Sequence, residues 1–306
     1  MKMRMSAEVV RARETGRPVV ALESSIWCQG LPWPQNLEGA RRVAQAVVSE
    51  GAVPAVLAVS DGEVRVGLED DELAAWCESR DAVKMGMRDI GWVLARGIRG
   101  ATTVSASVAI CAAAGIEVFV TGGIGGVHLD TGGHDVSTDL AALAEHPVCV
   151  VSSGAKSVLD VDATLERLES LGVCVIGYGT DCFPVFYSPT SRWPVSVRLD
   201  DPAEVAAAWR AARATGLRQS MLVAHPVPEA DAIDAALIDR WVSEALAEAA
   251  LAQVKGKDVT PFLLGWLHRH SEGATLRANL SLVEANARLG ARIAGALTAA
   301  GRSPSR

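Results

Sequence analysis

Short apolar runs alternate with longer helical patterns along most of this chain, and that alternation limits the folds open to it. A strand that is apolar throughout is buried on both faces, and a helix between successive strands is the connection that parallel pairing requires. We therefore predict an α/β fold with three α/β/α layers, a mostly parallel or mixed central sheet and a helical C-terminal third. The buried strands are expected at residues 118–120, 148–151, 174–176 and 221–224.

Local signals place further elements around these strands. Residues 18–22 are expected to form a strand and residues 34–50 a helix, with Pro34 in its first turn. An Asp-Gly dipeptide favours a tight hairpin between strands at 53–60 and 63–66. Further helices are expected at residues 88–95, 104–114, 229–253, 260–270 and 275–300.

The composition suits one large domain. Of the 306 residues, 49% are hydrophobic and 21% are charged, so a large core can be buried. No linker-like or low-complexity segment divides the chain. We therefore predict a single α/β domain over residues 1–306, with residues 1–7 and 301–306 flexible.

The charge balance and the cysteines limit the binding partners and the cellular compartment that we expect for this protein. The formal net charge is −7, from 29 basic and 36 acidic residues, which argues against binding to a nucleic-acid backbone. A small anionic ligand needs only a local positive pocket, so its binding is compatible with this net charge. We expect neither a signal peptide nor a membrane helix, because no apolar run has the required length and flanks. The six cysteines include no CxxC pair, so we expect reduced thiols in a cytoplasmic protein.

Lys156 and Glu23 are the candidate catalytic residues. Lys156 follows the predicted strand at 148–151, where a strand is expected to meet a helix. Burial lowers the pKa of a lysine, and an uncharged amine is a nucleophile for carbonyl carbons. Glu23 ends the first predicted strand, where a carboxylate with a raised pKa can act as a general acid. Taken alone, each residue is more often a capping or paired charge.

Two segments are candidate binding loops. Residues 121–126, TGGIGG, allow the backbone to approach a ligand closely, although a tight turn explains them equally well. Residues 101–105, ATTVS, open a predicted helix, and the free N–H groups at a helix start suit a phosphate. Lys84 and Arg88 can supply the counter-charge. An ordinary helix cap with solvated basic residues is an equally good interpretation.

The loop at 128–139 is the densest in polar side chains. Ser137 and Asp139 can cap a following helix. Alternatively, Asp135 and Asp139 can hold a hard divalent cation through oxygen and water. The two histidines of the loop lack the spacing of a zinc site, so Mn²⁺ or Mg²⁺ is favoured over zinc.

Several segments share a resemblance to one family. They are ALESSIWCQGLPWPQNLE, VPAVLAVSDGEVRVGL, KMGMRDIG, TTVSAS, VFVTGGIGGVH, DVSTDL, SSGAKSVLD, GYGTDCFPVFY, GKDVTPFLL and LRANLSLVEANA. Together they resemble the pseudouridine-5'-phosphate glycosidases, a group that includes proteins of indigoidine-type and C-nucleoside antibiotic pathways. The resemblance runs in order from about residue 8 to residue 296. One such segment is a weak sign, whereas the whole set in register is specific.

The resemblance implies an enzyme that breaks a carbon–carbon bond. The reaction is the reversible cleavage of pseudouridine 5'-phosphate into uracil and ribose 5-phosphate, through a covalent lysine iminium. An α/β/α fold, a homotrimer and a divalent metal, typically Mn²⁺, are also implied. By residue match, Glu23 would be the proton donor and Lys156 the nucleophile. The other matches are Lys84, Thr103, Val104, Ser137, Thr138 and Asp139 for the sugar phosphate, Asp135 for the metal, and Thr121, His128 and Asn279 for the uracil edge.

Departures from the family pattern leave the aglycone open. Gln29 stands where the family usually has histidine, and His225 replaces a common asparagine. Gly86 and Met87 replace a serine and an arginine. The alternative function is a C-glycosynthase that joins ribose 5-phosphate to a uracil-like or imide heterocycle, since the same residues serve both directions.

Two other classes are disfavoured. A sugar kinase should carry a Gly-x-Gly-Asp motif late in the chain, and residues 260–300 contain none. A non-catalytic binding protein would form no covalent adduct at Lys156 with ribose 5-phosphate. Trapping that adduct with borohydride would therefore separate a binding protein from an enzyme.

Overall fold

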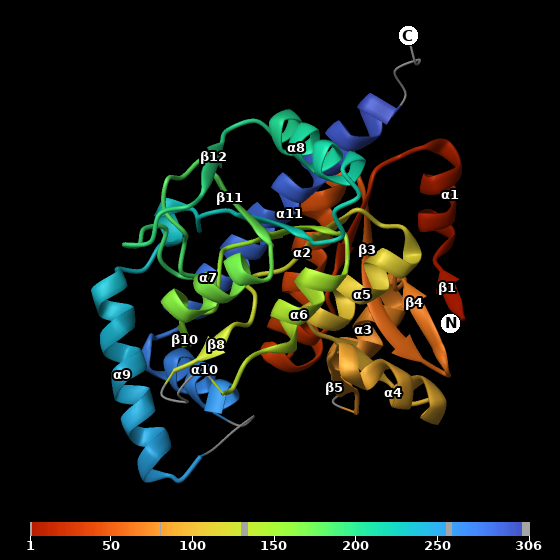
Figure 1. Ribbon diagram of the computed structural model, residues 1–306. Coiled ribbons are helices and arrows are strands. Elements are labelled where there is room, and N and C mark those ends of the chain that lie inside the picture. Colours follow the sequence, from red (N-terminus) through yellow and green to blue (C-terminus); the bar gives the residue numbers. More distant parts are fainter. Residues whose placement is uncertain (1, 80, 130–133, 255–258, 302–306) are drawn as a thin grey trace.

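The computed structural model describes residues 2–79, 81–129, 134–254 and 259–301, arranged as three α/β/α layers (Figure 1). The parallel part of the sheet contains, side by side, β3 (Val53–Ser60), β2 (Val19–Leu22), β7 (Val118–Val120), β9 (Cys149–Ser152), β13 (Met221–Ala224), β11 (Cys174–Tyr178) and β12 (Val197–Leu199). All neighbours in this row pair in parallel. The mostly parallel, mixed sheet predicted from the sequence is confirmed, and the predicted buried strands form its centre.

The sheet becomes antiparallel at one edge. β3 pairs with β4 (Glu63–Val66) as the predicted hairpin, and also with β6 (Gly100–Thr102). β6 pairs in turn with β5 (Val83–Met85), which carries Lys84. At the outer edge, β1 (Met3–Met5) pairs with β4. The prediction that residues 1–7 are flexible is therefore wrong for β1, whose backbone satisfies the otherwise open edge of β4.

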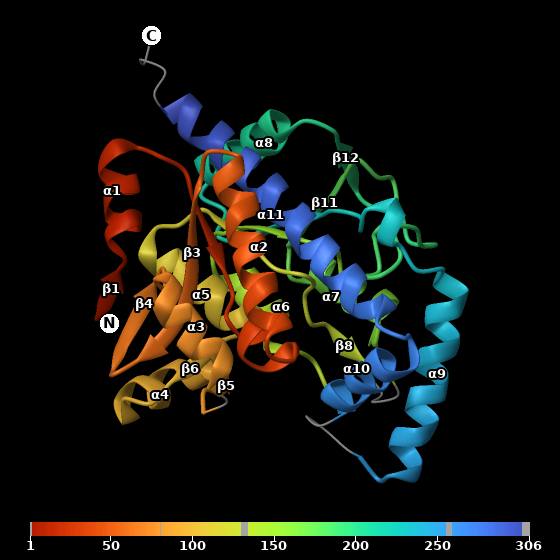
Figure 2. The ribbon, with the colours of Figure 1, turned by 180° about the vertical axis from the view of Figure 1, so that it is seen from behind.

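Helices cover both faces of the sheet (Figure 1, Figure 2). One face carries α2 (Gln35–Ser49), α8 (Pro202–Ala214) and α11 (Ala274–Gly301), and the other carries α5 (Val104–Ala114), α6 (Thr138–Glu145) and α7 (Val161–Ser170). The long helix α11 contacts α2 and α8 as well as β2, β7 and β9. Phe119 and Phe183 are fully buried in the core. Each such ring contributes about 2 kcal/mol through burial.

The remaining helices lie at the two ends of the sheet. Near the antiparallel edge are α1 (Ala7–Thr15), α3 (Asp70–Glu78) and α4 (Ile90–Arg96). At the other end, α9 (Ala235–Leu251) and α10 (Val259–His270) pack against each other, and α9 lies away from the main sheet in both views. The helical C-terminal third is thus confirmed. Within the described residues, no helix has the length and apolar character needed to cross a membrane.

Candidate active site

A cavity of about 420 Å³ opens at the carboxyl ends of the central strands. In an open parallel sheet, loops from neighbouring strands meet at this edge and ligands bind there. Glu23 follows β2, Thr121 follows β7 and Lys156 lies beyond β9, and all three line the cavity. Lys84 from β5 and Asn279 from α11 line it as well. The fold therefore gathers candidate residues that are far apart in the sequence.

Glu23 is nearly buried, with 9% of its surface exposed, and hydroxyl groups hold both of its carboxylate oxygens. Ser25 Oγ donates to Oε2 over 2.5 Å, and Thr121 Oγ1 donates to Oε1. A hydroxyl can also accept a hydrogen bond, so rotation of either one lets the same pair hold the protonated acid. The site fixes the position of this carboxylate while leaving it able to give and take a proton.

Lys156 is half-buried in the loop between β9 and β10 (Leu159–Asp160), and not at the start of a helix as predicted. The next helix, α7, is capped by Asp160, so the interpretation of Lys156 as a helix cap is wrong. The Lys156 N–H donates to Ile124 O over 3.1 Å, which ties this loop to the glycine-rich loop after β7. Gly154 has a φ of 71°, and a Cβ there would lie 1.9 Å from Pro184 O. The turn before the lysine therefore requires glycine.

Lys84 is accessible from the cavity, yet the protein around its amine disfavours the charged form. Burial lowers the pKa of Lys84 below its usual value, and the positive charge of Lys156 lowers this pKa further. The carboxylates of Glu23 and Asp139 act in the opposite direction. The two amines therefore lie close enough to repel each other within one site.

Hydroxyl groups gather next to β5, where α5 begins. Ser105 Oγ lies 3.2 Å from both Thr103 Oγ1 and Thr138 Oγ1. Val104, the first residue of α5, is buried and contributes its backbone here. A helix start with clustered hydroxyls suits a phosphate. Arg88, in contrast, is exposed, and its Nε lies 3.9 Å from Asp89 Oδ1. It is not among the described residues that line the cavity.

Asp139 joins this helix start to the glycine-rich loop. Its Oδ1 accepts from the Ser105 N–H over 2.9 Å, and its Oδ2 accepts from the Gly125 N–H over 2.8 Å. Ser137 Oγ accepts from the Asp139 N–H over 3.2 Å and caps α6, which confirms the capping interpretation for Ser137. Because one backbone N–H donates to each of its carboxylate oxygens, Asp139 ties the start of α5 to the glycine-rich loop.

Asp135 is the candidate ligand for a divalent cation. Its side chain is half-buried. Across the described part of the chain, no group of three or more His, Cys, Asp or Glu side chains is placed to hold an ion. Residues 130–133 of the same loop lie outside the described residues. A single carboxylate fits a hard and largely hydrated cation such as Mn²⁺ or Mg²⁺, whereas zinc takes three or four protein ligands.

Of the residues assigned to the uracil edge, Asn279 and Thr121 line the cavity and His128 does not. The Oδ1 atom of Asn279 is buried and has no hydrogen-bond partner among the described residues. A buried acceptor without a partner lowers the stability of the folded protein, and a ligand N–H that reaches it removes this penalty. His128 lies in β8 (Val127–His128), which pairs with β10.

Apolar side chains form another part of the cavity wall. Ile26 and Leu31 come from the segment after β2, and Leu264 and Leu276 come from α10 and α11. His268 of α10, for which the sequence predicts no role, lies among them. This wall has few polar groups with which to recognise a small, hydrogen-bonding base.

The residues that depart from the family pattern lie at or near the cavity. Gln29 lines it and donates from Nε2 to Ala82 O over 2.7 Å. Met87 donates from its N–H to Ser105 Oγ over 3.1 Å, so its backbone belongs to the hydroxyl cluster. His225 follows β13 behind the cavity. The departures therefore change the wall and the surroundings of the site, and leave Glu23 and Lys156 in place.

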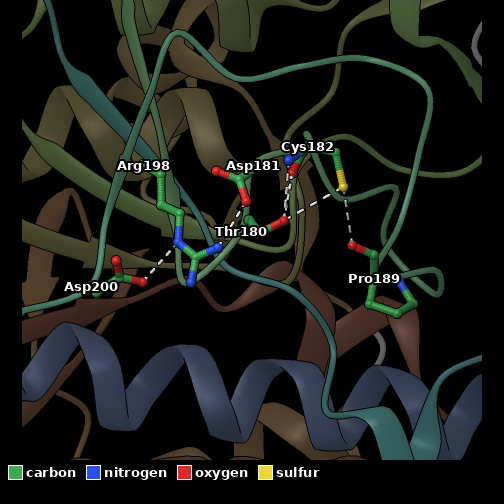
Figure 3. A network of polar contacts seen from close by, with 6 residues as sticks. All are labelled: Thr180, Asp181, Cys182, Pro189, Arg198 and Asp200. Atoms are coloured by element: carbon green, nitrogen blue, oxygen red, sulfur yellow. Dashed lines mark hydrogen bonds and ion pairs between the residues drawn. The ribbon is translucent and has the colours of Figure 1, made fainter.

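The loop after β11 carries Phe186 to the cavity wall. Polar contacts fix the base of this loop (Figure 3). Arg198 lies between Asp181 and Asp200 and donates to their carboxylates over 2.8 and 2.9 Å. Exposed ion pairs add little stability, so the contribution of this network is to the path of the loop.

Sequence reasoning missed Asn286, a fully buried residue of α11. Its Nδ2 donates to Thr121 O over 3.0 Å and to Ser153 Oγ over 3.1 Å, and its Oδ1 lies 3.0 Å from His225 Nδ1. Asn286 lies two helical turns after Asn279. That spacing places both side chains on one helix face, and it was the signal available in the sequence.

Comparison with known proteins supports the predicted resemblance. Residues 8–296 match the family model described as indigoidine synthase A like protein. The chain is 48% identical over 297 residues to the pseudouridine-5'-phosphate glycosidase of Gemmatimonas aurantiaca, covering 97% of each chain. It is 50% identical over 297 residues to that of Symbiobacterium thermophilum, covering 95% of this chain and 96% of the relative.

Solved structures agree with this assignment. An indigoidine synthase A-like protein from Thermotoga maritima is 37% identical, with a TM-score of 0.88 and 97% of each chain covered. The prealnumycin C-glycosynthase AlnA, solved in complex with ribulose 5-phosphate, is 38% identical, with a TM-score of 0.91 and 98% of each chain covered. Because the family model and these relatives span nearly the whole sequence, this protein belongs to the indigoidine synthase A-like family.

Proposed function

We propose that this protein catalyses the reversible cleavage of pseudouridine 5'-phosphate into uracil and ribose 5-phosphate. The observation that carries the proposal is the placement of Glu23 and Lys156 on one cavity, with the carboxylate held by two hydroxyls. An acid and an amine that face one enclosed space suit covalent catalysis at a sugar carbon. Relatives that are 48% and 50% identical are pseudouridine-5'-phosphate glycosidases.

The reaction begins at the ribose ring, because a carbon leaving group has no lone pair to protonate, unlike the oxygen of an ordinary glycoside. The uncharged amine of Lys156 attacks C1', the bond from C1' to the ring oxygen breaks, and Glu23 gives its proton to that oxygen. The attached nitrogen then returns one proton to the Glu23 carboxylate. These transfers open the ring and leave a secondary amine on C1'.

Carbon–carbon cleavage follows from this adduct. Glu23 first gives its proton to C5 of uracil: the electron pair of the C5=C6 double bond forms the new C–H bond, and the N1 lone pair forms C6=N1. The nitrogen lone pair of the Lys156 adduct then forms the C1'=N iminium as the bond from C1' to C5 breaks, and that bonding pair restores the C5=C6 bond and neutral N1. Water adds to the iminium and releases ribose 5-phosphate and free Lys156, and the proton set free returns to Glu23. Lysine suits this step because its nitrogen lone pair readily forms the iminium as the carbon–carbon bond breaks, whereas the oxygen of a carboxylate ester is a much weaker electron donor.

Substrate recognition divides between the cavity and the adjoining hydroxyl cluster. The unpartnered Oδ1 of Asn279 can accept an imide N–H of uracil. The cluster of Thr103, Ser105 and Thr138 at the start of α5 suits the phosphate. Asp135 would hold a largely hydrated Mn²⁺, or Mg²⁺, which supplies positive charge to the sugar phosphate when bound.

A second candidate is a C-glycosynthase that runs the same chemistry toward bond formation with another heterocycle. The apolar wall of Ile26, Leu31, Leu264 and Leu276 favours it, because an aglycone with a larger apolar surface would bury that surface there. The structural relative AlnA is a C-glycosynthase. The chemistry at Lys156 is common to both candidates, so the aglycone decides between them.

The deciding experiment is incubation with pseudouridine 5'-phosphate and Mn²⁺, with uracil measured by chromatography. We expect uracil release that is lost in Lys156→Arg and Glu23→Gln. Borohydride with ribose 5-phosphate should add the sugar phosphate to Lys156, as mass spectrometry of the tryptic peptide would show. An adduct without uracil release would support the C-glycosynthase, and the absence of both would exclude the two candidates together.

The family resemblance also supports a homotrimer in the cytoplasm. Light scattering of the purified protein would test the trimer, and fractionation of producing cells would test the location. A monomer with full activity would contradict the assembly without affecting the chemistry.

A further inference from the structure

Asn286 connects three elements behind the cavity through one side-chain amide. It lies on α11, and its Nδ2 donates to Thr121 O at the end of β7 and to Ser153 Oγ at the end of β9. We propose that Asn286 is a positioning residue for the reaction, and that His225 fixes the orientation of its amide. This inference rests on the function proposed above.

The orientation of the amide follows from its partners. Thr121 O can only accept, so the Nδ2 group of Asn286 must face it. The Oδ1 atom then faces His225 Nδ1 over 3.0 Å, and the histidine must carry its proton on Nδ1. Burial lowers the pKa of His225 below its usual value, which keeps the ring neutral near neutral pH. A neutral ring with a proton on Nδ1 is therefore the nearer donor to Oδ1, because Ser153 Oγ lies 3.5 Å from that oxygen.

The same amide touches the supports of both catalytic groups. Thr121 places its hydroxyl on the carboxylate of Glu23. Ser153 begins the turn that leads to Lys156, and the Ser153 N–H donates to Gly122 O over 2.8 Å. Loss of the amide contacts would shift the acid and the nucleophile relative to each other. A displacement of about 1 Å between reacting groups can cost about 100-fold in rate.

Asn286 itself does not line the cavity, and neither does His225. A change at His225 should therefore act on the rate of the chemical steps and leave the binding of substrate nearly unchanged. That separation distinguishes a positioning role from a direct contact with the ligand.

The experiment compares His225→Phe, which removes the donor, with His225→Asn, which restores a donor of the kind common in the family. Ser220→Ala is the matched control, because Ser220 is buried just before β13 and donates to His146 O at the opposite end of the strand from His225. We expect His225→Phe to lower kcat for uracil release about 10- to 100-fold with KM within about twofold. His225→Asn should keep most of the activity, and Ser220→Ala should keep kcat while lowering the melting temperature.

Adduct formation gives a second readout. The rate of borohydride trapping of ribose 5-phosphate at Lys156 should fall in His225→Phe and recover in His225→Asn. Asn286→Leu should show the same kinetic loss as His225→Phe. If that variant does not fold, the two His225 variants decide the question by themselves.

Three results would overturn the inference: unchanged kcat in His225→Phe, a rise in KM alone, or an equal loss in His225→Asn. Any of these in a protein whose wild type releases uracil contradicts the positioning role only. A wild type without uracil release and without a trapped adduct contradicts the proposed function instead.

Discussion

The hydroxyl of Thr121 donates to the carboxylate of Glu23, which joins residues 98 positions apart in the chain. This contact gives Thr121 a role in holding the acid, in addition to the place at the uracil edge that the resemblance implies. We expect Thr121→Val to lower kcat about 10- to 100-fold and to change KM little, because the acid loses one of its two hydroxyl partners. Thr121→Ser keeps the hydroxyl and should retain most activity. Steady-state uracil release measures both variants. A raised KM with unchanged kcat would place Thr121 on the base instead.

The lowered pKa of Lys84 predicts a pH dependence of stability. In the unfolded chain this amine titrates near 10.5, and in the folded protein it titrates lower. Between the two values the unfolded state binds more protons, so the free energy of unfolding should rise as pH rises through that window. Lys84→Met should flatten this rise, as urea unfolding across the alkaline range would show. Lys2→Met, at an exposed position, is the control. Parallel curves for wild type and Lys84→Met would contradict the prediction.

The unpartnered Oδ1 atom of Asn279 predicts that its loss weakens binding of the uracil base and nothing else. Asn279→Leu should raise KM for pseudouridine 5'-phosphate about 10-fold or more, because an imide N–H of uracil would lose its acceptor. Trapping of ribose 5-phosphate at Lys156 should be unaffected, since that ligand carries no uracil. Equal losses in both assays would show that Asn279 supports the cavity as a whole.

Removal of the metal tests Asp135. Chelation should lower uracil release, and added Mn²⁺ should restore it. Asp135→Asn should shift the Mn²⁺ concentration for half-maximal activity upward by about tenfold, because a hydrated cation would lose this charged ligand. The electron paramagnetic resonance signal of free Mn²⁺ measures binding independently of activity. Unaltered Mn²⁺ binding in Asp135→Asn would place the ion elsewhere.

Two glycines with similar backbone angles give a test of the turn before Lys156. Gly154 has a φ of 71° and faces Pro184 O. Gly179 has a φ of 67°, and among the described residues other than its chain neighbours no atom lies within 4 Å of the position that a Cβ would take. Gly179→Ala should cost about 1–2 kcal/mol of unfolding free energy, from the left-handed angle alone. Gly154→Ala should cost about 3 kcal/mol or more, because a collision adds to the angle. Urea unfolding measures both, and equal losses would mean that the Pro184 segment moves away freely.

The sequence predicted the centre of the fold well because its signals there are local. The apolar runs predicted at residues 118–120, 148–151, 174–176 and 221–224 lie in β7, β9, β11 and β13, and the β3–β4 hairpin is marked by its Asp-Gly turn. The three-residue strands β1, β5, β6 and β12 were missed, since MRM, VKM, GAT and VRL are too short to show a period. Pairing with neighbours distant in the sequence, and not residue preference, makes these segments strands.

The residues of the candidate site were likewise predicted only in part. Glu23, Lys84, Thr121, Lys156 and Asn279 were predicted, and the structure places them on one cavity. Asn286 was not predicted, because its role depends on Thr121, Ser153 and His225 meeting in space. The place of Lys156 before β10 was also missed, since a two-residue strand has no signal of its own.

The position of α11 has a consequence for synthesis of the chain. This helix backs β2, β7 and β9 and carries both Asn279 and Asn286. On the ribosome, the last strand of the sheet is made before α11 emerges, so the part of this face over β2, β7 and β9 stays uncovered until then. Chaperones that bind exposed apolar surface should therefore associate with nascent chains that end before residue 274 and release those in which α11 has docked.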